Sequence, residues 1–189
     1  SSVKENGFDW VLERVCAGLA VDRAAIVAMA PGGLLMEIES RPQPRTRREA
    51  SAARADPRIA ALVLAAGRST RMAPRNKLLE EVAGVPVVRR TVEAALASRA
   101  RPVVVVTGHE ADRVGAALAG LDVRFVHNEA FCDGLSTSLA KGIASLAPDI
   151  DGALGVLGDM PVVEAGHLDR LIAAFSPEEG RAICVPVAA

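Results

Sequence analysis

From residue 58 onward, short apolar runs alternate with longer amphipathic stretches, a pattern that few folds accommodate. The apolar runs cover residues 59–65, 103–107, 123–126, 153–157 and 183–187. The stretches between them have apolar residues at helical spacing and cover residues 87–98, 110–119, 136–146 and 165–175. Strands that are apolar on both faces are typical of a parallel sheet with helices on both sides. The alternation therefore predicts a three-layer α/β/α fold around one mainly parallel, Rossmann-like sheet.

Glycine, polar and charged residues follow the first four apolar runs. In chain order, these residues are Gly67, Gly108 with His109, Asn128 and Asp159. In an open parallel sheet the carboxyl ends of the strands share one edge, and ligands bind outside that edge. The sequence therefore predicts a binding site where these four loops meet.

The loop after the first run contains the residue types that phosphate binding requires. Gly67 has no Cβ to keep a phosphate away from the backbone. Arg68, Arg71 and Lys77 can neutralise several negative charges together. The spacing is neither that of a P-loop nor that of a dinucleotide-binding loop. Residue chemistry alone leaves a strand-to-helix turn with solvated arginines as an equal alternative.

Composition argues against two classes of function. The formal net charge is −1, aromatic residues make up 3% and Tyr is absent, so nucleic-acid binding is not expected. No apolar run approaches the ~20 residues of a membrane span, and no signal peptide is expected. The three cysteines form no metal-binding pattern, and an odd number of them suits a reducing compartment. We therefore expect a cytoplasmic protein that has no membrane or nucleic-acid partner.

Three sequence segments carry a more specific signal. They read Leu-Ala-Ala-Gly-Arg-Ser-Thr-Arg-Met at 64–72 with Asn-Lys-Leu-Leu at 76–79, Asn-Glu-Ala-Phe-Cys-Asp-Gly-Leu-Ser-Thr-Ser-Leu at 128–139, and Leu-Gly-Asp-Met-Pro at 157–161. In this order the segments resemble those of the molybdenum cofactor cytidylyltransferases, whose catalytic domain is a MobA-like NTP transferase domain. The resemblance extends from residue 59 to the C-terminus. It implies the nucleotidyltransferase version of the fold, which is also described as nucleotide-diphospho-sugar transferase-like.

The resemblance implies an enzyme that transfers CMP from CTP to molybdenum–molybdopterin, uses Mg²⁺ and releases pyrophosphate. Ala66 before Gly67 is the pattern of the cytidylyl-transferring relatives, since the guanylyl-transferring ones tend to have Gly-Gly there. A molybdoenzyme or another protein of cofactor biosynthesis is the implied partner. Two alternatives stay open. One is a related transferase with another NTP or a phosphorylated sugar or polyol acceptor, and the other is a nucleotide- or pterin-binding module without turnover.

The resemblance also implies roles for individual residues. Lys77, Arg71 and Asp159 are expected to be catalytic, with Asp159 as the ligand of the metal. The nucleotide pocket is expected to include Leu64, Ala65, Ala66, Gly67, Arg68, Ser69, Thr70, Asn128, Gly134, Ser136 and Ser138. A second acidic metal ligand is expected beyond the C-terminus of this sequence. The structural alternatives are a solvated lysine at a helix start for Lys77 and a helix N-cap for Asp159 or Ser136.

The first part of the chain has a different character. Helical spacing predicts a helix over residues 8–19 and a second short helix over 23–29. Residues 1–40 resemble the tail of a molybdopterin-binding domain. Residues 41–57 contain two prolines and four arginines within 41–48, which predicts a flexible linker. Residues 58–189 form the expected NTP transferase domain, which would be truncated at its C-terminus.

Overall fold

A five-stranded parallel sheet forms the centre of the computed structural model, which describes residues 25–28, 36–41, 57–69, 75–176 and 183–188. In spatial order the strands are β1 (Ala25–Ala28), β8 (Gly152–Leu157), β3 (Ile59–Ala65), β6 (Val103–Thr107) and β7 (Arg124–His127). Every residue of β3 is buried. This strand therefore lies at the centre of the sheet, with β8 on one side and β6 on the other.

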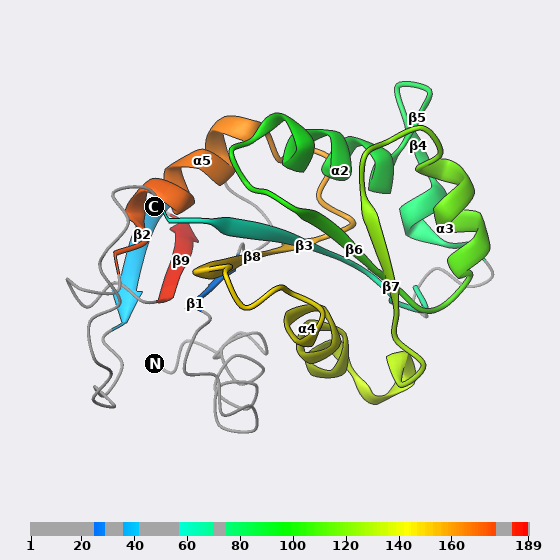
Figure 1. Ribbon diagram of the computed structural model, residues 1–189. Coiled ribbons are helices and arrows are strands. Elements are labelled where there is room, and N and C mark those ends of the chain that lie inside the picture. The colour runs from blue at the N-terminus through cyan, green and yellow to red at the C-terminus, as the bar shows by residue number, and fades with distance from the viewer. Residues whose placement is uncertain (1–24, 29–35, 42–56, 70–74, 177–182, 189) are drawn as a thin grey trace, which may run out of the picture.

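Helices cover both faces of this sheet (Figure 1). On one face lie α2 (Val87–Ala97), α3 (Ala111–Ala117) and α5 (Ala165–Ala174), and on the other lies α4 (Leu135–Ala144). The alternation of side chains along β3 supplies both cores. Ala61 and Val63 pack in the cluster under α2 and α5, whereas Leu62 and Leu64 pack in the cluster under α4. The predicted three-layer α/β/α fold is confirmed.

The predicted elements from residue 59 to residue 175 are all present with small shifts at their ends. Strands β3 and β6 have the predicted bounds, and β7 and β8 each begin within one residue of the predicted start. The structure adds a short hairpin of β4 (Glu81–Val82) and β5 (Val85–Pro86). Its two-residue turn, Ala83 and Gly84, has positive φ at both positions, as tight hairpin turns require. None of the helices among the described residues is long and apolar enough to span a membrane.

The prediction for the last strand is wrong in its pairing. Strand β9 (Ile183–Ala188) is not in the parallel sheet but pairs antiparallel with β2 (Met36–Arg41) in a separate two-stranded sheet. The position beside β8 is taken by β1 instead. An apolar run specifies a strand, but the run does not encode which neighbour supplies its hydrogen bonds.

The prediction of a helix over residues 23–29 is also wrong, because Ala25–Ala28 form strand β1. The segment is short and contains Ile26 and Val27, whose branched side chains favour a strand once a neighbouring strand is available. Strands from both ends of the chain pair with one another, so the described parts of residues 1–41 and 58–189 share sheets. The predicted helix over residues 8–19 and residues 42–56 of the predicted linker lie outside the described residues.

Candidate active site

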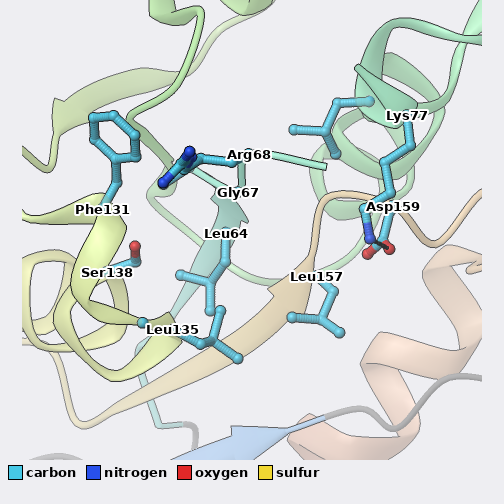
Figure 2. A pocket seen from close by; sticks show the side chains of 12 residues that line it. Leu64, Gly67, Arg68, Lys77, Phe131, Leu135, Ser138, Leu157 and Asp159 are labelled. Atoms are coloured by element: carbon cyan, nitrogen blue, oxygen red, sulfur yellow. Dashed lines mark hydrogen bonds and ion pairs between the residues drawn. The ribbon is translucent and has the colours of Figure 1, made fainter. Parts of the chain in front are cut away.

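A pocket of about 310 Å³ opens at the carboxyl edge of the sheet, where the loops after β3, β7 and β8 meet (Figure 2). Leu64, Leu135 and Leu157 lie on one side of it, and Lys77 and Asp159 contribute charge. The complete lining is Leu64, Ala66, Gly67, Arg68, Lys77, Leu78, Phe131, Gly134, Leu135, Ser138, Leu157 and Asp159. Three of the four predicted loops therefore line the pocket at one edge, and the fourth, after β6, contacts the loop after β3 through the His109 N–H without lining the pocket.

Most of the predicted site residues that the structure describes line this pocket. They are Leu64, Ala66, Gly67, Arg68, Lys77, Gly134, Ser138 and Asp159. Four others lie on the same segments without lining it, namely Ala65, Ser69, Asn128 and Ser136. Thr70 and Arg71 lie outside the described residues. The sequence reasoning missed Leu78, Phe131, Leu135 and Leu157, although all four occur within or beside the quoted motifs.

The described part of the loop after β3, residues 66–69, is called the glycine loop here, and its backbone at Gly67 faces open space. A Cβ added at Gly67 would meet no atom within 4 Å, and both Gly67 and Arg68 are exposed. Ala66 is buried, and its carbonyl oxygen accepts a hydrogen bond from the His109 N–H at 3.2 Å. The loop therefore rests on the neighbouring β6 loop, and its outer side is free to face a ligand.

Lys77 and Asp159 form an ion pair at the pocket. The Lys77 ammonium donates to Asp159 Oδ2, and the two side chains are 43% and 29% exposed. Lys77 is the first residue of the short 3-10 helix η2 (Lys77–Leu79), so it does lie at a helix start, as the structural alternative predicts. Its ammonium is paired with Asp159 and is not simply solvated. Asp159 caps no helix, because the following helix, α5, begins at Ala165 with Glu164 as its N-cap. The pair joins the segments after two adjacent strands, β3 and β8.

Buried contacts fix the turn that carries Asp159. The Gly158 N–H donates to the Leu64 carbonyl oxygen at 2.9 Å, and a Cβ at Gly158 would lie 3.1 Å from that oxygen. On the other side, the fully buried Thr91 hydroxyl lies 3.3 Å from the Gly158 carbonyl oxygen and 3.2 Å from that of Met160. Thr91 belongs to α2, far away in the sequence, and no local motif pointed to it. The backbone on both sides of Asp159 is therefore hydrogen-bonded to neighbouring elements, β3 and α2.

The segment before Lys77 is held by Asn76, whose side chain is buried. Asn76 Oδ1 accepts hydrogen bonds from the Leu78 N–H at 3.1 Å and the Ser69 hydroxyl at 3.3 Å, and Asn76 Nδ2 donates to Glu110 Oε2 at 2.9 Å. Hydrogen bonds from Arg113 and then from Asn76 hold the pKa of Glu110 below its ordinary value. The sequence reasoning assigned no role to Asn76 or Glu110.

Asn128 organises the loop that follows β7. Its buried amide donates to Thr137 Oγ1 and Ser138 Oγ, each at 2.9 Å, and its Oδ1 accepts from the Ala130 N–H at 3.1 Å. The structural alternative for Ser136, that it caps the following helix, is wrong. Helix α4 begins one residue earlier, at Leu135, after a glycine with φ of 111°, and its N-cap makes no side-chain hydrogen bond.

Phe131 covers the end of β6. A Cβ at Gly108 would lie 2.6 Å from Phe131 Cβ and 2.9 Å from Ala66 Cβ, so only glycine fits between them. The Phe131 ring is also tilted against the His109 ring, with 6.2 Å between their centroids. Close backbone packing thus brings Phe131 to the wall of the pocket, beside Arg68 in Figure 2.

Asp159 is the carboxylate with which this pocket could bind a divalent cation. The described residues contain no group of three His, Cys, Asp or Glu side chains that could hold a metal by themselves. Mg²⁺ commonly binds through one or two carboxylates together with substrate phosphates and waters. A single half-buried carboxylate in an open pocket fits that mode of binding, with the remaining ligands coming from the substrate and solvent.

The profile of the MobA-like NTP transferase domain matches residues 61–189. The chain belongs to this family. The match begins within β3 and includes the glycine loop, Lys77 and Asp159. It gives no support to a molybdopterin-binding tail in residues 1–40.

Individual proteins are also similar to this chain. The bifunctional protein GlmU of Leifsonia xyli is 37% identical over 123 residues, which cover 63% of this chain and 25% of that protein. A nucleotidyl transferase from Methanothermobacter has a solved structure that is 39% identical, with a TM-score of 0.57, over 61% of this chain and 57% of that one. Rv0371c of Mycobacterium tuberculosis, solved in complex with manganese, is 32% identical with a TM-score of 0.50 over 62% and 59% of the two chains. The chain spans about a quarter of the length of the curated relative.

Proposed function

We propose that this MobA-like domain transfers CMP from CTP to molybdenum–molybdopterin and releases pyrophosphate. The observation that carries the proposal is the ion pair between Lys77 and Asp159, which lies beside the open glycine loop in a pocket large enough for part of a nucleotide. A transferase of this kind must hold a triphosphate, carry a metal ligand and stabilise charge at the reacting phosphorus. The pocket has a candidate residue for each task.

In the proposed reaction an acceptor phosphate oxygen forms a bond to the α-phosphorus of CTP as the bond from that phosphorus to the bridging oxygen of pyrophosphate breaks. Negative charge develops on the pyrophosphate and on the phosphoryl oxygens during this step. Lys77 places an ammonium where such charge would be stabilised, and Asp159 holds that ammonium in position before substrate arrives. A divalent cation bound to Asp159 and the phosphates would supply further neutralisation of charge. The exposed backbone of Gly67 and Arg68 is available to the remaining phosphates.

The choice of CTP is supported by the small space around Ala66. The Ala66 methyl group packs against Gly108, and Ala66 lines the pocket, where a glycine would leave more room. Gly134, the N-cap of α4, and Ser138, in the first turns of that helix, also line the pocket and can face the base or ribose. The molybdopterin acceptor is supported only by the resemblance of the three sequence segments to the molybdenum cofactor cytidylyltransferases. The test therefore includes the alternatives of another NTP and of a sugar or polyol phosphate acceptor.

The test is to measure binding and pyrophosphate release with CTP, GTP, UTP and ATP, each with Mg²⁺ and with molybdopterin or a sugar phosphate as acceptor. We expect CTP to bind best and to release pyrophosphate only with the molybdopterin acceptor. Preference for GTP would overturn the cytidylyl assignment, and turnover with a sugar phosphate would identify the alternative transferase. Binding without any turnover would favour the non-catalytic module.

Lys77→Ala tests whether CTP binds at the proposed site rather than elsewhere on the protein. The substitution removes a charge-assisted contact, so we expect CTP affinity to fall by about 1.5–3 kcal/mol, which is about ten- to a hundredfold. Lys141→Ala is the matched control, because Lys141 is an exposed lysine on α4 that does not line the pocket. Equal CTP affinity in the two variants would rule out the phosphate role of Lys77.

A further inference from the structure

We propose that Glu110 and Asn76 are positioning residues, through which the loop after β6 holds Lys77 and the glycine loop in the geometry that binds a triphosphate. This inference rests on the proposed function, and neither residue lines the pocket itself. Its basis is a continuous set of side-chain hydrogen bonds that joins three segments, which lie after β3, at η2 and after β6.

Asn76 is the centre of this set. The residue is 5% exposed, and both ends of its amide are used. Its oxygen accepts from the backbone of η2 and from the Ser69 hydroxyl, and its nitrogen donates to Glu110. An aspartate of the same size would have no N–H to donate to Glu110, so the amide is the group that suits this position.

Ser69 extends the set to the glycine loop. Its hydroxyl accepts from the Lys77 N–H at 3.2 Å and donates to Asn76 Oδ1 at 3.3 Å, so Ser69 is hydrogen-bonded to two residues seven and eight positions away. Ser69 itself has φ of 49°, a left-handed conformation that a serine adopts only when its surroundings require it. These hydrogen bonds tie the backbone that bears Lys77 to the end of the glycine loop.

Glu110 anchors the set to the sheet. It occupies the N-cap position of α3 but makes no side-chain capping bond, and its φ of 51° is also left-handed. Its side chain instead contacts Asn76 through Oε2 and Arg113 through Oε1. Glu110 leaves the start of α3 uncapped but contacts a neighbouring loop. Its left-handed conformation is therefore better explained by the contact with Asn76 than by a role in the helix.

The variants are chosen so that stability and affinity change independently. Glu110→Gln keeps an oxygen acceptor within reach of Asn76. Glu110→Asn tolerates the left-handed conformation and is a good N-cap, but its side chain is one methylene shorter and does not reach Asn76. Asn76→Ala removes the centre of the set. Arg113→Gln is the matched control, because it removes the other partner of Glu110, on the exposed side.

The measurement is calorimetric titration of CTP and of CMP with Mg²⁺, together with the melting temperature of each variant. We expect Glu110→Asn and Asn76→Ala to weaken CTP binding about tenfold, the size of one lost charge-assisted contact. CMP binding should weaken less, because the proposed function assigns the glycine loop to the phosphates that CMP lacks. Glu110→Asn should melt less far below the wild type than Asn76→Ala does, because a better N-cap and a residue suited to the left-handed conformation offset part of the lost hydrogen bond. Glu110→Gln and Arg113→Gln should keep the CTP affinity within about twofold.

Unchanged CTP affinity in both Glu110→Asn and Asn76→Ala, with a wild-type protein that binds CTP, would overturn this inference and leave the proposed function standing. Equal weakening of CTP and CMP, in step with a lowered melting temperature, would show a purely structural role and overturn it as well. A wild-type protein that binds no CTP would overturn the proposed function and, with it, this role.

Discussion

At the scale of single residues, the site depends on a carboxylate that follows a buried strand. A charge in such a position is costly unless it has a partner, and Lys77 supplies one for Asp159. Both side chains remain partly exposed, so the pair is worth little to stability, on the order of 1 kcal/mol or less. Its exposure leaves it accessible to a substrate, which suits a catalytic role better than a structural one.

Asp159→Asn therefore tests function with little effect on folding. The change removes a charge but keeps the shape, so Mg²⁺-dependent pyrophosphate release should fall by about a hundredfold or more, the scale of losing one fixed electrostatic group. The free energy of unfolding should change by less than about 1 kcal/mol. Asp122→Asn, at an exposed position that does not line the pocket, should leave both quantities unchanged. Full activity of Asp159→Asn would remove this residue from the mechanism.

At the scale of elements, the pocket depends on how closely α4 packs on the sheet. Gly142 of α4 is buried, and a Cβ there would lie 3.0 Å from Val106 Cγ2 and 3.2 Å from Leu62 Cδ1. The glycine lets the helix backbone approach strands β3 and β6. This approach places Leu135 and Ser138, at the start of the same helix, against the pocket.

Gly142→Val should destabilise the protein, because the larger side chain must push α4 away from β3 and β6. Overpacking of this kind costs about 1–3 kcal/mol. Gly115→Val is the matched control, since Gly115 lies in α3 with nothing within 4 Å of a built Cβ. Valine and glycine have similar helix propensities, so the control should change stability by about 0.5 kcal/mol or less. Urea unfolding measures both variants, and equal destabilisation would contradict close packing at Gly142.

At the scale of the whole molecule, the sheet is unequally protected from water. Strand β3 is hydrogen-bonded on both sides and covered on both faces, whereas β7 is at the edge with Arg124, Phe125 and His127 exposed. The residues with a role in the site follow β3, β6 and β8 as well as β7. The site therefore combines a rigid centre with one loop carried by a less protected edge strand.

Hydrogen exchange should reproduce this order. Amides of residues 59–65 should exchange only through global unfolding, whereas those of residues 124–127 should exchange faster through local opening of the edge. Mass spectrometry of peptides that cover the two strands measures the difference. Equal protection of both strands would indicate that another part of the molecule covers the β7 edge.

The sequence by itself determined the strands of the parallel sheet and the helices between residues 59 and 175, though not the short hairpin of β4 and β5, and it determined the edge at which the site forms. Apolar periodicity is a local property, so β3 and β6 were predicted to the residue and α2 to within one residue of its end. The carboxyl ends of parallel strands necessarily share an edge, which was enough to place Gly67 and Asp159 close together.

Only the tertiary structure decided which distant groups meet. Thr91 of α2 hydrogen-bonds to the turn that carries Asp159, 67 positions from Gly158 in the sequence. The Glu110 carboxylate accepts a hydrogen bond from Asn76, 34 positions away. Strand β9 pairs with β2 instead of joining the parallel sheet. None of these contacts leaves a periodic signal, because a hydrogen-bonding group can be satisfied by any partner that the fold brings within reach. The local pattern thus specified the elements and their ends, while packing selected the partners that hold the site.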